Sequence, residues 1–212
     1  MSATDYQTLI DHYEACFAAH GDTHLGVDWP NAADAETRYR VMLEVMRPHN
    51  RGRATLLDFG CGAAHLCEHL QRHGRDDVEY VGLDASEKFI DLCRRKFPAH
   101  EFHAVDVLAD DAPLPAVDYV VMNGVLTEKR GLPFDAMCDY MEKLLPRVFA
   151  AARVGLAFNV MSAHVDWERD DLFHLPYDRL AAFLKRRVSR HFQFRADYGL
   201  YEYTTYVYRE PR

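Results

Sequence analysis

Short apolar runs alternate with amphipathic segments along most of the chain, and this alternation constrains the fold more than any other feature. The runs predict strands at residues 54–59, 78–83, 101–105, 116–122 and 155–160. Apolar residues at helical spacing predict helices at 63–73, 87–97, 134–152 and 177–188. Because the runs are almost continuously apolar, they indicate a parallel sheet that is covered by helices on both faces.

The two ends of the chain depart from this alternation. Residues 192–198 and 201–208 alternate as strands do and join at Gly199, which predicts a terminal antiparallel hairpin. Near the start, helical spacing runs from Tyr6 to Gly21 after a capping-box pair, Thr4 and Gln7, and Asn31 can cap a second helix. We therefore predict an α/β fold with a Rossmann-like, seven-stranded, mostly parallel sheet whose last strand is antiparallel. A single domain over 1–212 would consist of a helical N-terminal cap (1–50) and a Rossmann-like core (51–212).

Composition narrows the class of protein. The 212 residues are 49% hydrophobic and carry a formal net charge of −8, which argues against a broad nucleic-acid or anionic-membrane surface. The longest stretch without a charged residue, 154–165, is shorter than the roughly 18 residues of a membrane span. The five cysteines form no C-x-x-C pair, and the start lacks the features of a signal peptide. We expect a cytoplasmic protein with no metal site.

The most specific local signal is a glycine turn between the first predicted strand and helix. Gly60 and Gly62, with Cys61 between them, allow the backbone to turn tightly and approach a ligand. The free N–H groups of the new helix are expected to point toward that ligand. The dinucleotide fingerprint G-x-G-x-x-G would need glycine where His65 stands. With Asp58, the sequence is instead D-x-G-x-G, which resembles motif I of class I S-adenosylmethionine methyltransferases.

Further carboxylates stand where successive strands end. Asp84 closes the second strand, where a carboxylate can accept both hydroxyls of a ribose. Asp106 closes the third strand, where it can accept an adenine amino group. Asn123 follows the fourth strand, beside the expected position of a reacting methyl group. The predicted cofactor-binding residues are Asp58, Gly60, Cys61, Gly62, Asp84, Ala85, Asp106, Val107 and Asn123.

A wider resemblance supports the same class. The chain resembles class I methyltransferases over residues 54–126 and 154–209, and almost its whole length is similar to a little-characterised group of small bacterial methyltransferases. The residues that carry the resemblance are His20-Gly21, Gly26 to Trp29, Leu57 to Gly62, Tyr80 to Asp84, Asp118 to Val121, Ala157 to Asn159 and Asp197 to Thr204. The resemblance implies the seven-stranded fold and methyl transfer from S-adenosylmethionine, but no particular acceptor. His65 and the pair Asn123-Gly124 depart from the expected pattern.

The acceptor site is predicted from polar and aromatic residues on the cap and on two loops. His164 is the favoured general base, oriented by Asp166, and Asn123 completes the catalytic set. The predicted substrate-contacting residues are Tyr13, Trp29, Glu128, Trp167 and Tyr177. Other interpretations stay open, since Trp29 can simply pack on the next helix, Glu128 can form a solvated pair with Lys129, and His164 can be merely exposed.

The function predicted from the sequence is methyl transfer from S-adenosyl-L-methionine to an oxygen or nitrogen atom of a small metabolite. No nucleic-acid or membrane partner is expected, because no reader module or basic tail is present. The sequence leaves the oligomeric state open. A non-catalytic module that binds S-adenosylmethionine or S-adenosylhomocysteine, or a partner subunit, is the alternative function. A nicotinamide oxidoreductase is disfavoured by His65 and Asp58.

Overall fold

The computed structural model describes residues 6–48, 52–109 and 113–211. The helices are α1 (Gln7–His20), the short 3-10 helix η1 (His24–Val27), α2 (Ala32–Leu43), α3 (His65–Arg72), α4 (Glu87–Lys96), α5 (Phe134–Ala151) and α6 (Tyr177–Arg187). The strands are β1 (Ala54–Phe59), β2 (Val78–Asp84), β3 (Glu101–Ala104), β4 (Val117–Met122), β5 (Ala152–Ser162), β6 (His174–Leu175), β7 (His191–Arg195) and β8 (Glu202–Tyr208). Within the described ranges, no helix is long and apolar enough to cross a membrane.

The strands form one sheet in the order β3-β2-β1-β4-β5-β8-β7, and the two-residue β6 pairs with β5. The pairs among β1 to β5 are parallel, and β8 runs antiparallel to both β5 and β7. The predicted mostly parallel sheet with an antiparallel last strand is therefore confirmed. Sequence analysis did not predict β6, which is too short to show a pattern.

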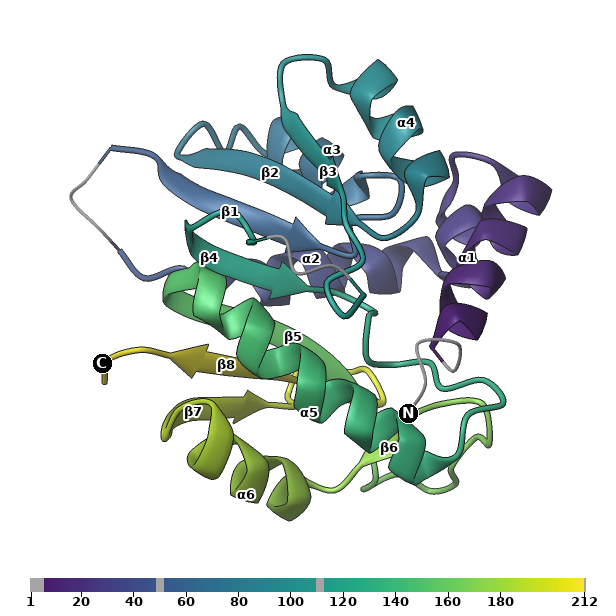
Figure 1. The fold of residues 1–212 in the computed structure, drawn as a ribbon, viewed down its shortest axis with the longest axis vertical. Coiled ribbons are helices and arrows are strands. Elements are labelled where there is room, and N and C mark those ends of the chain that lie inside the picture. The colour runs from purple at the N-terminus through teal and green to yellow at the C-terminus, as the bar shows by residue number, and fades with distance from the viewer. Residues whose placement is uncertain (1–5, 49–51, 110–112, 212) are drawn as a thin grey trace.

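Helices cover both faces of the sheet, as the almost wholly apolar strands require. Figure 1 shows α5 and α6 in front of the sheet and α2 behind it. Alternate residues of β1 enter different cores: Leu57 packs in the cluster that contains the α5 and α6 residues, and Leu56 packs with residues of α2 and α3. All of these side chains are buried, so the chain has a hydrophobic core on each side of one sheet.

The two N-terminal helices occupy different places. α2 belongs to one of the two cores, since Val41 and Met42 are fully buried and the hydroxyl of Tyr206 donates to the backbone oxygen of Val41. α1 instead lies beside the carboxyl ends of β1 and β4 (Figure 1). Thr4 of the predicted capping box lies outside the described residues. The division into a cap (1–50) and a core (51–212) stays a prediction.

Candidate active site

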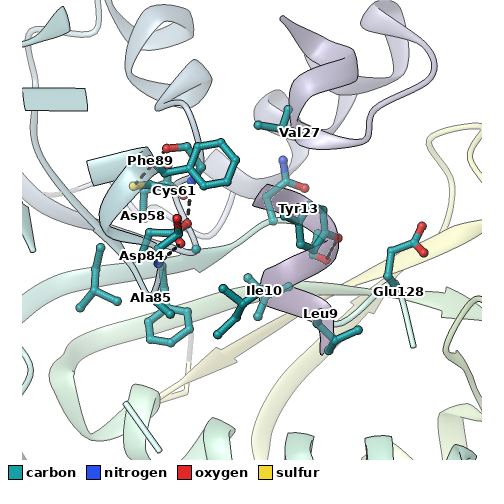
Figure 2. Close-up of a pocket in the computed structure, with 18 of the residues that line it drawn as sticks. Leu9, Ile10, Tyr13, Val27, Asp58, Cys61, Asp84, Ala85, Phe89 and Glu128 are labelled. Atoms are coloured by element: carbon teal, nitrogen blue, oxygen red, sulfur yellow. Dashed lines mark hydrogen bonds between the residues drawn. The ribbon is translucent and has the colours of Figure 1, made fainter. Parts of the chain in front are cut away.

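A cavity of about 160 Å³ opens at the carboxyl ends of β1, β2 and β4. Parallel α/β sheets bind ligands in this position because the chain crosses from one face to the other there. Figure 2 shows Asp58, Cys61 and Asp84 on one side of the cavity, Ile10 and Tyr13 of α1 in the middle, and Glu128 on the other side. Every residue of the predicted cofactor-binding set lines this cavity: Asp58, Gly60, Cys61, Gly62, Asp84, Ala85, Asp106, Val107 and Asn123.

The glycine loop after β1 is fastened to the end of β2. The N–H groups of Gly60 and Cys61 donate to the backbone oxygen of Leu83 at 2.7 and 3.0 Å, and the N–H of Gly62 donates to Oδ2 of Asp84 at 2.9 Å. These three N–H groups are therefore used inside the protein. The crossover needs them to hold its own shape.

Two glycines of the cavity wall combine a positive φ with close contacts. Gly60 has φ 73°, and a Cβ there would lie 2.5 Å from Cγ2 of Val125. Gly124 has φ 86°, and a Cβ there would lie 2.8 Å from Cζ2 of Trp29. A side chain at either position would thus strain the backbone and push neighbouring atoms toward the cavity.

Two carboxylates at the strand ends are desolvated. Asp58 is buried and accepts a hydrogen bond of 2.8 Å from the hydroxyl of Tyr80, yet burial raises its pKa to about 7. Burial also raises the pKa of Asp84, against the lowering effect of the N–H groups of Ser86 and Gly62. A raised carboxyl pKa means that the environment disfavours the negative charge, so a cationic ligand would relieve this cost.

One face of α1 covers the cavity. Tyr6, Leu9, Ile10 and Tyr13 follow helical spacing, and all of them line it. The hydroxyl of Tyr6 donates to both carboxylate oxygens of Asp106, at 2.8 and 3.0 Å. α1 therefore covers the cavity together with Val27, Asp28 and Trp29.

Ion pairs fasten α1 and the segment after it to the sheet side of the cavity. Glu14 accepts from the hydroxyl of Ser86 at 2.6 Å and pairs with Lys88. Asp22 pairs with Lys96 at 2.8 Å and with His65 at 3.0 Å. His65, which departs from the usual motif, therefore serves this attachment as well as lining the cavity.

The other end of the cavity holds Tyr13, Trp29, Asn123 and Glu128, all of which the sequence analysis predicted. Burial raises the pKa of Glu128, and the neighbouring Asp28 raises it further, although the guanidinium of Arg130 lies 3.3 Å away. Oδ1 of Asn123 is buried and has no hydrogen-bond partner among the described residues. An acceptor oxygen of this kind is suited to a ligand N–H or O–H.

A network of buried contacts positions this end of the cavity. The N–H of Gly124 donates to Oδ1 of Asn159 at 2.8 Å, and Nδ2 of Asn159 donates to Oε1 of Glu202 at 3.0 Å. Oε2 of Glu202 accepts from Nε of Arg38 at 2.8 Å. The guanidinium of Arg38 lies 4.2 Å from the ring centre of Trp29, whose edge faces Gly124. The network closes on itself and joins α2, β5 and β8 to the loop after β4.

Four predicted residues do not reach the cavity. His164, Asp166, Trp167 and Tyr177 are absent from its lining, and these residues belong to the described part of the chain. His164 is exposed and stacks on Tyr177, with ring centres 5.2 Å apart, while Tyr177 packs on Tyr203 at 4.3 Å. Trp167 is 70% exposed. The geometry gives no support to a catalytic role for His164 and Asp166 or to a substrate contact by Trp167 and Tyr177.

Some lining residues were missed by sequence reasoning. Tyr6, Ile10, Asp28 and Phe89 line the cavity although none was predicted as a site residue. The helical spacing of Tyr6, Ile10 and Tyr13 was a usable signal, because it places them on one face. For Asp28, the indication from the sequence is weaker, namely that it is adjacent to the predicted site residue Trp29.

The fold is that of class I methyltransferases. Two features define it: the strand order, in which the antiparallel β8 lies beside β5, and the glycine loop after β1. A magnesium protoporphyrin IX methyltransferase from Synechocystis PCC 6803, crystallised with S-adenosylmethionine, superposes with a TM-score of 0.65 at 15% identity, covering 99% of this chain and 100% of that one. Human N-acetylserotonin methyltransferase superposes with a TM-score of 0.62 at 14% identity, covering 98% of this chain and 58% of that one.

Sequence comparison agrees with the fold. A family model described as a methyltransferase domain matches residues 57–155. A protein of Mycobacterium tuberculosis named as a methyltransferase, Rv1506c, is 29% identical over 152 residues, which are 71% of this chain and 90% of that protein. The chain therefore has the fold of class I methyltransferases, and its sequence is similar to a methyltransferase domain over residues 57–155.

The Arg38–Glu202 pair should matter for stability, because the side chains are only 12% and 1% exposed. Arg38→Met leaves a buried carboxylate without its partner and should lower the free energy of unfolding by about 3–5 kcal/mol. The double variant Arg38→Met/Glu202→Gln should recover part of that loss, since glutamine is neutral and keeps an acceptor for Asn159. Urea unfolding measures all of these variants.

The exposed pair between Arg153 and Asp118 supplies the matched control. Arg153 is 56% exposed, so Arg153→Met should cost less than about 1 kcal/mol. An equal decrease in the free energy of unfolding for Arg38→Met and Arg153→Met would show that burial of the Arg38–Glu202 pair does not contribute to stability.

The raised pKa of Asp58 predicts how stability varies with pH. The folded protein retains the proton up to a pKa of about 7, whereas the unfolded chain releases it near pH 4. The Asp58 contribution to stability should therefore fall as pH rises from 4 to 7, by up to about 4 kcal/mol. Asp58→Asn should remove this slope in urea unfolding of the ligand-free protein. Tyr80→Phe should steepen it, because the hydroxyl stabilises the carboxylate. Parallel curves for the wild type and Asp58→Asn would contradict this assignment.

Proposed function

We propose that this protein transfers the methyl group of S-adenosyl-L-methionine to an oxygen or nitrogen atom of a small metabolite. The observation that carries the proposal is the cavity at the strand ends, which is lined by Asp28, Asp58, Asp84, Asp106 and Glu128 and, among the described residues, by no lysine or arginine. Such a lining suits a cationic ligand. The cofactor carries a cationic sulfonium and supplies the electrophilic methyl group when bound.

The residues at the carboxyl ends of β1 to β4 fit this cofactor. Asp84 has the position of a ribose ligand, since its two oxygens each accept one backbone N–H and keep further lone pairs free. Asp106, held by Tyr6, has the position of an adenine ligand. Asp58 and Asp84, which are costly to ionise because they are buried, would favour a cationic ligand. These roles rest on the positions of the residues in the cavity and on the class of the protein.

The acceptor end would hold a small molecule, because α1 and the loop that carries Trp29 cover the cavity. Tyr13 and Trp29 provide aromatic walls, and the carboxamide oxygen of Asn123 accepts a hydrogen bond from the acceptor. The net charge of −8 gives no attraction to a phosphate backbone. The protein's part in an in-line displacement is then to hold the acceptor atom about 3 Å from the methyl group and to exclude water.

Glu128 is the residue that we assign to receive the proton of the acceptor. It lines the cavity at the acceptor end, and burial raises its pKa toward the range in which a carboxylate is an effective base. The earlier candidate, His164, stacks on Tyr177 away from the lining. Its role as the base stays a prediction that the geometry does not favour.

Cofactor binding can be tested by calorimetry. The protein should bind S-adenosylmethionine and S-adenosylhomocysteine but not NAD. Asp84→Ala should weaken S-adenosylhomocysteine binding by about 10–100-fold, which corresponds to hydrogen bonds to a charged group of about 1.5–3 kcal/mol.

Asp118→Ala is the matched control for this test. Asp118 is near the amino end of β4, far along the strand from the cavity, and it bonds Thr55 there. Its removal should leave the affinity unchanged. Binding of NAD with no response to either adenosyl compound would contradict the proposal.

The base can be tested by release of S-adenosylhomocysteine in the presence of a panel of small hydroxyl and amine compounds. With any hydroxyl acceptor found, Glu128→Gln should lower kcat by about 10²–10⁴-fold while cofactor affinity stays unchanged. His164→Ala should change kcat less than about threefold, since its ring lies outside the cavity.

The opposite pattern, a large loss for His164→Ala and little for Glu128→Gln, would restore the earlier candidate. Cofactor binding without turnover of any compound would favour the non-catalytic module.

A further inference from the structure

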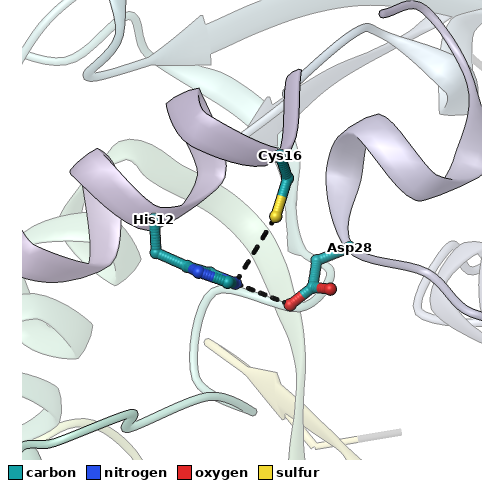
Figure 3. Close-up of side chains that lie close together, drawn as sticks. All are labelled: His12, Cys16 and Asp28. Carbon is teal, nitrogen blue, oxygen red and sulfur yellow. Dashed lines mark hydrogen bonds and ion pairs between the residues drawn. The ribbon is translucent and has the colours of Figure 1, made fainter. Parts of the chain in front are cut away.

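Three side chains with metal-binding atoms converge beside the acceptor end of the cavity: His12, Cys16 and Asp28 (Figure 3). Nε2 of His12 lies 2.7 Å from Oδ2 of Asp28 and 3.7 Å from Sγ of Cys16. All three ligand atoms lie within 4.8 Å of one another, and all three residues are partly buried. Asp28 also lines the cavity, whereas His12 and Cys16 stand behind it.

The local structure fixes this arrangement. His12 and Cys16 are four residues apart in α1, so their side chains project from the same face of the helix. Asp28 ends η1 in the left-handed conformation, with φ 57°, and its N–H bonds to the backbone oxygens of His24 and Leu25. A non-glycine residue in this conformation is uncommon. In this left-handed conformation, the carboxylate of Asp28 points at the ring of His12.

We propose that His12, Cys16 and Asp28 bind a divalent transition metal ion, with zinc as the best-suited candidate. An imidazole nitrogen, a thiolate and a carboxylate oxygen are the ligand types of zinc sites, and the thiolate disfavours magnesium and calcium. Tetrahedral zinc separates nitrogen and sulfur ligands by about 3.5 Å, close to the His12–Cys16 distance, and nitrogen and oxygen by about 3.3 Å. The His12–Asp28 pair must open by about 0.6 Å.

Charge also favours this cluster over two others of similar composition. In the cluster of Glu36, His69 and His73, the carboxylate is already paired with Arg72. In the cluster of Asp22, His65 and Glu68, Lys96 pairs with both carboxylates. Among the described residues, no lysine or arginine forms an ion pair with Asp28. A divalent ion would balance the carboxylate and the thiolate of the proposed site.

Three protein ligands leave one position of a tetrahedral ion open, which is typical of sites that bind a substrate atom or water. Because Asp28 lines the acceptor end, an oxygen, nitrogen or sulfur atom of a molecule in the cavity can complete the coordination. The ion would then help to hold the acceptor. This consequence rests on the proposed function, but binding of the ion itself does not.

Cobalt(II) is the probe for the test, because a cobalt–thiolate bond gives a charge-transfer absorption in the near ultraviolet that oxygen and nitrogen ligands do not give. The metal-free reduced protein should develop this band on titration with cobalt chloride and should lose it when one equivalent of zinc is added. The band should disappear in Cys16→Ser. Cobalt affinity should fall by more than about 100-fold in His12→Ala and Asp28→Asn, since each removes a direct ligand.

His73→Ala is the matched control, because it removes a histidine of the cluster of Glu36, His69 and His73 and should leave the band intact. Thermal unfolding of each variant by circular dichroism checks that the protein still folds. Absence of the band in the folded wild type would overturn the proposal, and so would a band that persists in folded Cys16→Ser. S-adenosylhomocysteine affinity, measured separately, distinguishes this failure from failure of the proposed function.

Discussion

The attachment of the β1–α3 loop to the end of β2 is the constraint on which the site depends. Three successive N–H groups, of Gly60, Cys61 and Gly62, bond to Leu83 and Asp84. These hydrogen bonds extend the β1–β2 pairing past the end of β1, and Gly60 and Gly62 can adopt the positive φ that the turn requires. The loop therefore cannot move away from β2 without breaking these three hydrogen bonds.

The pairing of β1 with β2 also brings two carboxylates together in a cavity whose lining, among the described residues, contains no lysine or arginine. Asp58 and Asp84 end adjacent parallel strands, so strand pairing alone places them at one edge of the sheet. Their desolvation is an energetic cost that the hydrogen bond from Tyr80 and the N–H groups of Gly62 and Ser86 offset only in part. Sites often retain such unfavourable charge because a ligand of opposite sign uses it. Here the two desolvated carboxylates, Asp58 and Asp84, lie beside the glycine loop that is bonded to β2.

The sequence was sufficient to locate the lining residues at the strand ends, but it located only some of the residues expected at the other end of the cavity, for a physical reason. A residue that follows a parallel strand must lie at the carboxyl edge, so Asp84, Asp106 and Asn123 could be located by counting along the chain. The path of a long loop depends instead on tertiary contacts. The loop after β5 returns through β6, and His164 stacks on Tyr177 instead of facing the cavity. No local sequence pattern predicts which way the side chain of His164 points.

Tyr13 and Trp29 show the complementary case, in which residues near the start of the chain become part of a site built by strands far away. Trp29 lies against Gly124, and the guanidinium of Arg38 packs on its ring. Glu202 of β8 pairs with Arg38 and also accepts a hydrogen bond from Asn159. Asn159 in turn accepts a hydrogen bond from the N–H of Gly124. This network joins α2, β5 and β8 to the cavity wall at Gly124, whereas β2 holds the glycine loop. Different hydrogen bonds thus hold the two ends of the cavity.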